Sequence, residues 1–306
     1  MQEREAPTPS DVQPLDPHRL LDQGIARLLT ELQAGQFERL EQYLTFVSRF
    51  HLYSAYNQLL ILEQCPEATQ VAGYRTWQKL GYPVRRGEKG IRILAPQPYK
   101  RANAETGAEE EAIAFKLASV FDASQLANLA EKPLPRFFTP LADDQPALYQ
   151  RLLAVVRAEG ITVSDERLAR AQGTSAGGRI ALREGLDSRN ALLTLLHEYT
   201  HELLHWGAAR NEISHPVREC HAEAVAFVVA YHFGVANPYS AAYLHHWGTT
   251  PKALVAELET VRRTAASIIR RVEQPAETDA GWDGQSVFVA PARADALHPV
   301  RGQPAE

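Results

Sequence analysis

The sequence predicts an α+β fold with two domains, an N-terminal domain of helices and a β-hairpin and a C-terminal, mainly α domain with a small sheet. Both halves of the 306-residue chain carry long stretches with apolar residues at helical spacing. Shorter stretches with a strand-like pattern lie between them. The segment Lys132–Pro140 holds three prolines in nine residues and reads as a linker between the halves. The length also exceeds the roughly 150 residues typical of one domain.

The first domain is expected over residues 18–135, after a polar, proline-rich leader over residues 1–17. Its first helix carries apolar residues at helical spacing from Leu20 and is closed by Gly35, and its third is stopped by Pro66. The two strands are separated by a glutamate-rich stretch that suits a hairpin loop. In order, the expected elements are helices over about 20–34, 37–47 and 56–63 and strands over 91–94 and 112–120.

The second domain is expected over residues 146–273, after a linker at 136–145 and before a flexible tail at 274–306. Its expected elements are a helix over 147–158, strands over 161–163 and 179–182, and helices over about 188–206, 217–233 and 252–272. The strand Arg179–Leu182 comes directly before the helix expected over 188–206. It is a candidate to align an extended substrate by strand addition.

The charge of the chain is unevenly distributed. The formal net charge is −5, yet the segment from Val71 to Arg101 holds eight Lys and Arg residues against one carboxylate, Glu88. Aromatic residues are interleaved with these cations, and a cationic groove with aromatic platforms is what single-stranded DNA binding requires. For Trp77, which lies on a short expected helix, the alternative to contact with DNA is a position in the hydrophobic core. The candidate DNA-binding residues are Tyr74, Arg75, Trp77, Lys79, Tyr82, Arg85, Arg86, Lys89 and Arg92.

The sequence also indicates the cellular compartment in which the protein is expected. No apolar run approaches the roughly 18 residues needed to cross a bilayer, and the N-terminus has no apolar core for a signal peptide. Two cysteines far apart, Cys65 and Cys220, do not form a disulfide framework. A cytoplasmic protein without a membrane partner is expected.

The strongest chemical signal is the stretch His197-Glu198-Tyr-Thr-His201 inside an apolar helix. Residues i and i+4 share one helix face, so both imidazoles can reach one ion. The intervening Glu198 is then placed to take a proton from a water that the metal activates. This spacing predicts a catalytic Zn²⁺ site.

A third ligand is expected on the next helix. Glu219 lies 18 residues after His201, and two histidines with one glutamate leave a fourth zinc position for water. Glu223 occupies the same helix face as Glu219, so it is either an alternative ligand or a partner that orients one of the histidines. His205 continues the spacing but is rotated away from His197, which favours an interaction with the helix dipole.

With these residues in place, the chain resembles the ArdC-like antirestriction proteins. The resemblance covers roughly residues 20–270 and is carried by several short blocks in order. These blocks are Tyr56–Gln58, Gly73–Trp77, Val84–Leu94, Phe121–Gln125, His197–His201 and Arg218–Phe227. Such proteins pair an N-terminal single-stranded-DNA-binding domain with a C-terminal zincin-type metallopeptidase domain related to the ImmA/IrrE proteases.

The resemblance implies a single-stranded-DNA-binding zinc metallopeptidase of antirestriction type that hydrolyses a peptide bond in an unidentified protein substrate. Two alternatives stay open. One is an IrrE-like stress regulator that cleaves a transcriptional repressor. The other is a non-catalytic single-stranded-DNA-binding protein that shields DNA from restriction.

Overall fold

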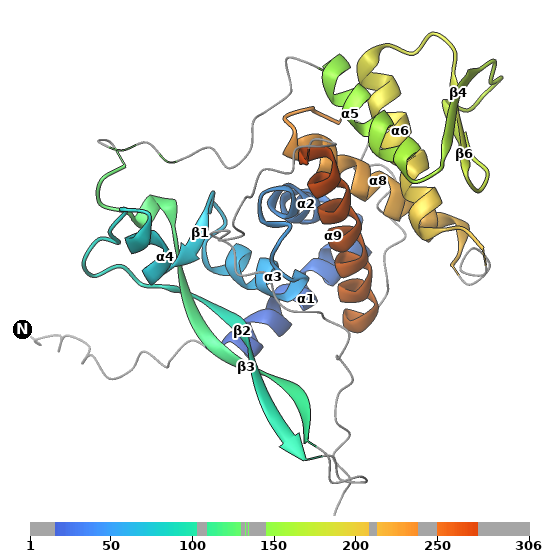
Figure 1. Cartoon of the computed structure of the whole chain (residues 1–306). Helices are drawn as coiled ribbons and strands as arrows, with labels where there is room; N and C mark the ends of the chain where they lie inside the picture. The colour runs from blue at the N-terminus through green and yellow to red at the C-terminus, as the bar shows by residue number, and fades with distance from the viewer. Residues whose placement is uncertain are drawn as a thin grey trace, which may run out of the picture.

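The α+β fold class is confirmed by the computed structural model, which describes residues 16–102, 109–129, 132, 134, 145–207, 213–237 and 250–274. The expected leader before residue 16, the tip of the hairpin, the linker at 136–144 and the tail after 274 lie outside the described residues. The division into two domains at the stated boundaries stays a prediction. Figure 1 shows the helices gathered on both sides of α9, with the β2–β3 ribbon projecting away from them.

Three helices open the described chain: α1 (Pro17–Gln33), α2 (Glu38–Phe50) and α3 (Ala55–Gln64). Asp16 caps α1 by accepting a hydrogen bond from the backbone of His18. Gly35 follows with φ of +73°, a left-handed conformation that favours glycine and ends the helix. All three helices agree with the sequence-based expectation.

The first sheet has the order β1-β3-β2 and holds β1 (Val71–Gly73), β2 (Ile91–Ala102) and β3 (Glu109–Asp122). Between β1 and β2 runs the short helix α4 (Tyr74–Lys79). The free edge of β2 is satisfied by amide side chains from α3. Asn57 exchanges two hydrogen bonds with the backbone of Leu94, and Gln64 does the same with Arg92.

The second sheet has the order β4-β6-β5, with β4 (Thr162–Glu166), β5 (Gly173–Ser175) and β6 (Arg179–Arg183). β6 pairs with β4 on one side and β5 on the other. The expectation that Arg179–Leu182 receives a substrate strand is therefore wrong, because both edges of that strand are occupied. The short strand β5, which the sequence reading missed, is an edge strand of this sheet.

Four further helices complete the described fold: α5 (Gln145–Ala158), α6 (Ser188–Leu204), α8 (His215–His232) and α9 (Pro251–Glu273). One continuous buried cluster includes apolar residues of α1–α3 and of these four helices. α9 packs against α1 and α3 as well as α5 and α8. Its Glu259 accepts a hydrogen bond from the backbone of Ala55, the first residue of α3, at 2.9 Å. In the described part of the chain, no helix is both long and apolar enough to cross a membrane.

Candidate functional site

The candidate metal centre lies between two packed helices, α6 and α8. Asp187 caps α6, and its carboxylate accepts a hydrogen bond from the backbone of Asn190. Leu195, Leu196 and Tyr199 are fully buried, which fixes the rotation of the helix. That rotation turns His197 and His201, one turn apart, toward α8.

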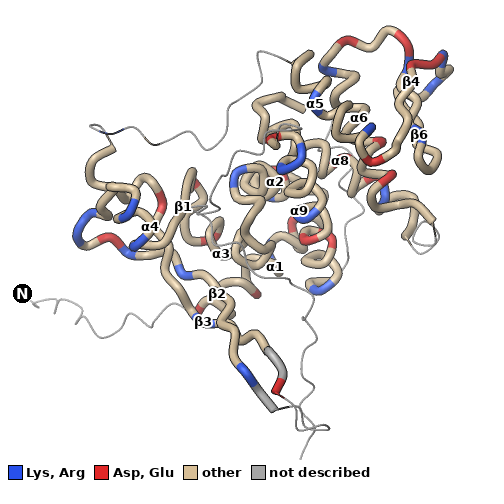
Figure 2. The backbone as a smooth tube through the Cα atoms, in the orientation of Figure 1, with Lys and Arg blue, Asp and Glu red and all other residues tan. Residues whose placement is uncertain are grey.

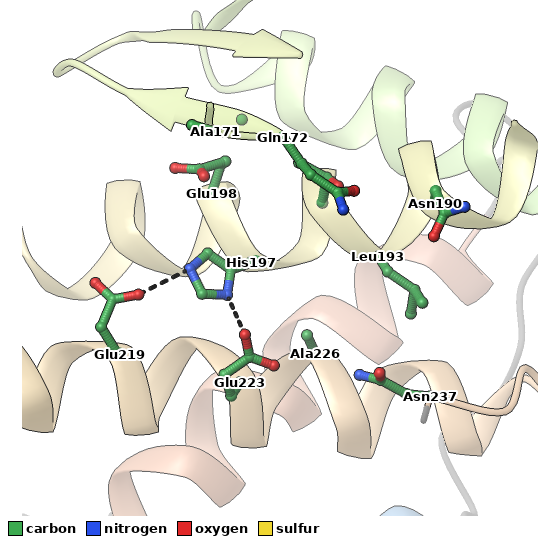
Figure 3. Close-up of a pocket in the computed structure, with 12 residues that line it drawn as sticks. Ala171, Gln172, Asn190, Leu193, His197, Glu198, Glu219, Glu223, Ala226 and Asn237 are labelled. Carbon is green, nitrogen blue, oxygen red and sulfur yellow. Dashed lines mark ion pairs between the residues drawn. The ribbon is translucent and has the colours of Figure 1, made fainter. Parts of the chain in front are cut away.

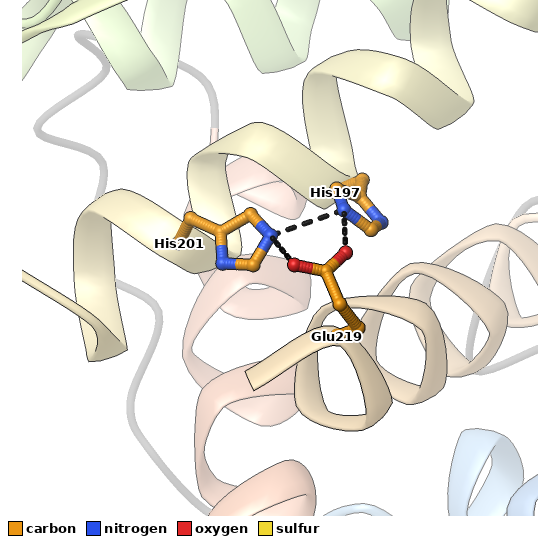
Figure 4. A group of neighbouring side chains, drawn as sticks. All are labelled: His197, His201 and Glu219. Carbon is orange, nitrogen blue, oxygen red and sulfur yellow. Dashed lines mark hydrogen bonds and ion pairs between the residues drawn. The ribbon is translucent and has the colours of Figure 1, made fainter. Parts of the chain in front are cut away.

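Three side chains converge there, as Figure 4 shows. The two Nε2 atoms of His197 and His201 are 3.1 Å apart. The Glu219 carboxylate places Oε2 at 3.3 Å from His197 Nε2 and Oε1 at 3.5 Å from His201 Nε2. One ligand atom from each residue lies within 4.8 Å of the others. Two imidazole nitrogens and one carboxylate oxygen form a donor set suited to Zn²⁺ with an open position.

The position of Glu223 distinguishes it from Glu219. Its carboxylate lies 3.2 Å from Nδ1 of His197, on the side of the ring that faces away from the convergent atoms (Figure 3). A metal-ligating histidine commonly donates its second N–H to a carboxylate in this way. The geometry thus favours Glu219 as the third ligand and Glu223 as the residue that orients His197.

The electrostatics of the cluster are those of a cation site. Burial alone would lower the pKa of His197, but its hydrogen bonds to Glu219 and Glu223 outweigh this and raise the pKa to about 10. Partial burial alone would raise the pKa of Glu219, but the two histidines hold it well below its usual range. Two carboxylates therefore favour a positive charge at this point, which a metal ion can supply.

Glu198 lines a pocket of about 510 Å³ together with His197, Glu219 and Glu223 (Figure 3). The side chain is 8% exposed, and burial raises the pKa of its carboxyl. β5 passes directly over it: a Cβ placed on Gly173 would come within 2.8 Å of Glu198 Cγ. An edge strand thus borders the pocket at the carboxylate expected to move a proton.

Two further histidines were not anticipated as part of the site. His205 is fully buried and bonds to His201 and His221, with Nδ1 to Nδ1 at 2.9 Å and Nε2 to Nδ1 at 3.1 Å. The expectation of a simple helix-dipole role is therefore wrong for His205. Burial, with the neighbouring His201 and His221 rings, lowers its pKa to about 3.

The predicted DNA-binding residues divide into buried and exposed groups. Trp77 is 1% exposed and donates its indole N–H to the backbone of Phe121, and Tyr82 is 3% exposed beneath Lys132. The prediction that these two rings stack on bases is therefore wrong for this conformation. They form a small core with Ala72, Ala123 and Leu126 instead.

Except for Arg92, which is half-buried on β2, the other members of the set are exposed on α4 and the loop that follows it, where Figure 2 shows blue cations. Tyr74 is 51% exposed. Arg85 is engaged by Glu88 and by the backbone of Leu126, and Arg92 contacts Ser119. Four cations of this set are exposed, and the part of the chain that the structure describes forms no ion pair with them: Arg75, Lys79, Arg86 and Lys89.

Sequence reasoning missed an apolar face on the β2–β3 ribbon. Ile113, Phe115 and Leu117 alternate along β3, so they share one face, and all three are exposed. The alternation is visible in the sequence, where it predicted a strand but no exposed apolar face.

This combination defines a class: an α+β protein with a candidate metal centre of two histidines and one glutamate on adjacent helices. Residues 19–121 match the family model of the N-terminal domain of the anti-restriction factor ArdC. This N-terminal part of the chain is therefore similar to the N-terminal domain of ArdC.

Three further matches extend over most of the chain. It shares its fold with the metal-free crystal structure of the antirestriction protein ArdC from plasmid R388, with a TM-score of 0.53 and 19% identity over 83% of this chain and 97% of that one. The Mn(II)-bound structure of the same protein matches with a TM-score of 0.47 and 17% identity, over 78% and 99% of the two chains. An uncharacterised protein of Bacillus anthracis is 23% identical over 75% of this chain, which spans about half (47%) of that relative's length.

Proposed function

We propose that this protein is a single-stranded-DNA-binding zinc metallopeptidase of the ArdC antirestriction type. The observation that carries the catalytic half is the convergence of His197, His201 and Glu219 beside Glu198 in one pocket. The pattern of exposed cations beside Tyr74 supports the DNA-binding half.

His197, His201 and Glu219 would hold the metal. When bound, Zn²⁺ supplies a Lewis acid that lowers the pKa of a water and polarises a peptide carbonyl. Glu198 accepts the proton of the attacking water on its carboxylate and delivers it to the leaving amine. β5 offers a free strand edge beside this carboxylate, so an extended peptide pairing there would run across the pocket.

The experiment that tests the catalytic half uses the full chain loaded with Zn²⁺ and a library of peptides from a digested proteome. New peptide termini that form with the metal and disappear on chelation would support the peptidase. A folded, zinc-loaded protein that cuts nothing in the library with or without single-stranded DNA would favour the non-catalytic alternative. Cleavage confined to a DNA-binding repressor would favour the stress-regulator alternative.

The DNA-binding half gives a prediction about salt. Replacing Arg86 and Lys89 together by glutamine should flatten the dependence of log affinity on log salt by roughly one to one and a half units, since each phosphate contact on a single strand contributes about 0.7. Both side chains are exposed on the loop between α4 and β2. Titration of a labelled oligonucleotide into the full chain at several salt concentrations measures the slope.

The matched control replaces Arg151 and Arg157, which are equally exposed but lie on α5. It removes the same charge from the chain and should leave the slope unchanged. An equal flattening in both double variants would mean that overall charge, and not this loop, governs binding. Tighter binding of duplex than of single strand at matched salt would contradict the proposed nucleic-acid preference.

A further inference from the structure

A chain of buried histidines leads from the candidate metal centre to α9. His201 Nδ1 lies 2.9 Å from His205 Nδ1, and His205 Nε2 lies 3.1 Å from His221 Nδ1. His221 Nε2 then bonds to the carboxylate of Glu257 on α9. Three helices, α6, α8 and α9, thus contribute to one line of hydrogen bonds.

The two middle rings are almost completely buried. His205 is 0% and His221 3% exposed, whereas the Glu257 side chain at the end of the line is 27% exposed. Their planes lie within 9° of parallel, with centroids 5.4 Å apart. Each ring nitrogen in the middle of the line has a histidine or carboxylate partner, so water is not needed to satisfy it.

The carboxylate at one end dictates the direction of every hydrogen bond. An ionised carboxylate only accepts, and a neutral imidazole donates from one nitrogen and accepts at the other. His221 therefore donates from Nε2 to Glu257 and accepts at Nδ1 from His205. His205 donates from Nε2 and accepts at Nδ1 from His201. The proton of His201 is thereby placed on Nδ1, and its Nε2 keeps a lone pair.

We infer that Glu257, acting through His221 and His205, is a positioning residue that fixes the tautomer and ring orientation of His201 for metal binding. Nε2 of His201 is the atom that faces Glu219 and His197. The inference rests on the proposed metal centre. It adds a residue from α9, 56 positions beyond His201 in the chain, to a site otherwise built by α6 and α8.

Each histidine of the metal centre then has a carboxylate that orients its ring, but one carboxylate acts by direct contact and the other through intervening side chains. His197 contacts a carboxylate directly, with Glu223 at 3.2 Å from its Nδ1. The Nδ1 atom of His201 reaches a carboxylate only through two intervening imidazoles. Since a carboxylate partner increases the basicity of a ligating imidazole, the relay performs at a distance what Glu223 performs in contact.

The test compares full-length Glu257→Gln with Glu273→Gln. Glu273 also lies on α9 and also bonds to a buried histidine, His232 at 2.9 Å, whose other ring nitrogen bonds to the backbone carbonyl of Ser48 on α2. Zn²⁺ affinity is measured by competition with a chromophoric chelator, and the visible spectrum of the Co²⁺-substituted protein reports ligand geometry. Glu257→Gln should bind Zn²⁺ about ten- to a hundredfold more weakly and shift the Co²⁺ bands. Glu273→Gln should match the wild type in both.

Nitrogen-15 NMR of histidine-labelled, metal-free wild type tests the tautomer without any substitution. His201 protonated on Nδ1 is the expected result, and a proton on Nε2 overturns the relay even if Glu257→Gln fails to fold. Wild-type Zn²⁺ affinity and Co²⁺ bands retained in Glu257→Gln also overturn it, while the metal centre itself stands. A wild-type protein that binds no metal overturns the proposed function and the relay together.

Discussion

Full-length protein carrying His201→Ala is expected to lose most of its zinc, with affinity falling by more than about a hundredfold. The loss should exceed the ten- to hundredfold cost typical of residues that only orient a ligand, because the Nε2 atom that faces His197 and Glu219 is removed outright. Metal analysis after dialysis against a weak chelator measures it, alongside the melting temperature of the metal-free protein.

The control is His18→Ala, which removes an exposed histidine from α1 and should leave zinc content unchanged. Unchanged zinc in His201→Ala would contradict the assignment of the centre.

A second pair of variants tests which glutamate is the third ligand. Glu219→Gln is expected to lose metal, and Glu223→Gln is expected to retain it with reduced affinity. The reverse order would make Glu223 the ligand and leave the class of site intact.

Glu198→Gln is expected to keep its zinc and its fold while any peptidase activity falls by about 10²- to 10⁴-fold. The amide has the same shape as the carboxylate, so it fits beneath Gly173. It cannot accept the proton of the attacking water, and no other carboxylate among those lining the pocket is free of contact with the candidate ligand His197. Initial rates on a peptide recovered from the library, with zinc content measured on the same sample, check this.

Glu184→Gln provides the comparison, since it removes an exposed carboxylate that pairs with Arg167 outside the pocket. Its activity should equal that of the wild type. Full activity in Glu198→Gln would mean that another group moves the proton. A parallel loss of zinc would instead place Glu198 among the residues that hold the metal.

The features that could be predicted from the sequence depend on residues that lie close together in the chain. The i, i+4 spacing of His197 and His201 fixes their common face, and Glu219 follows on the next helix, so the geometry of one helix pair decides all three positions. The helices α1, α2 and α9 have clear amphipathic patterns, and their bounds were predicted to within a few residues.

What could not be predicted depends on contacts between distant segments. Nothing in the spacing links Glu257 to His201, because two helices must pack before His221 can bridge them. The cations around Trp77 in the sequence do not indicate which face of a six-residue helix is buried, and in the structure the face that carries Trp77 is buried. β5 holds only three residues, too few for a periodic pattern.

The contacts of α9 predict how premature stop codons affect the protein. Its Glu257 completes the line to His201, and two residues later Glu259 holds the first backbone N–H of α3. A premature stop codon before residue 251 therefore strips the cover from α1 and α3 as well as from α5 and α8. Nonsense alleles that remove α9 should be pleiotropic, losing the proposed DNA binding and the proposed metal binding together, so selection on either trait also preserves the other.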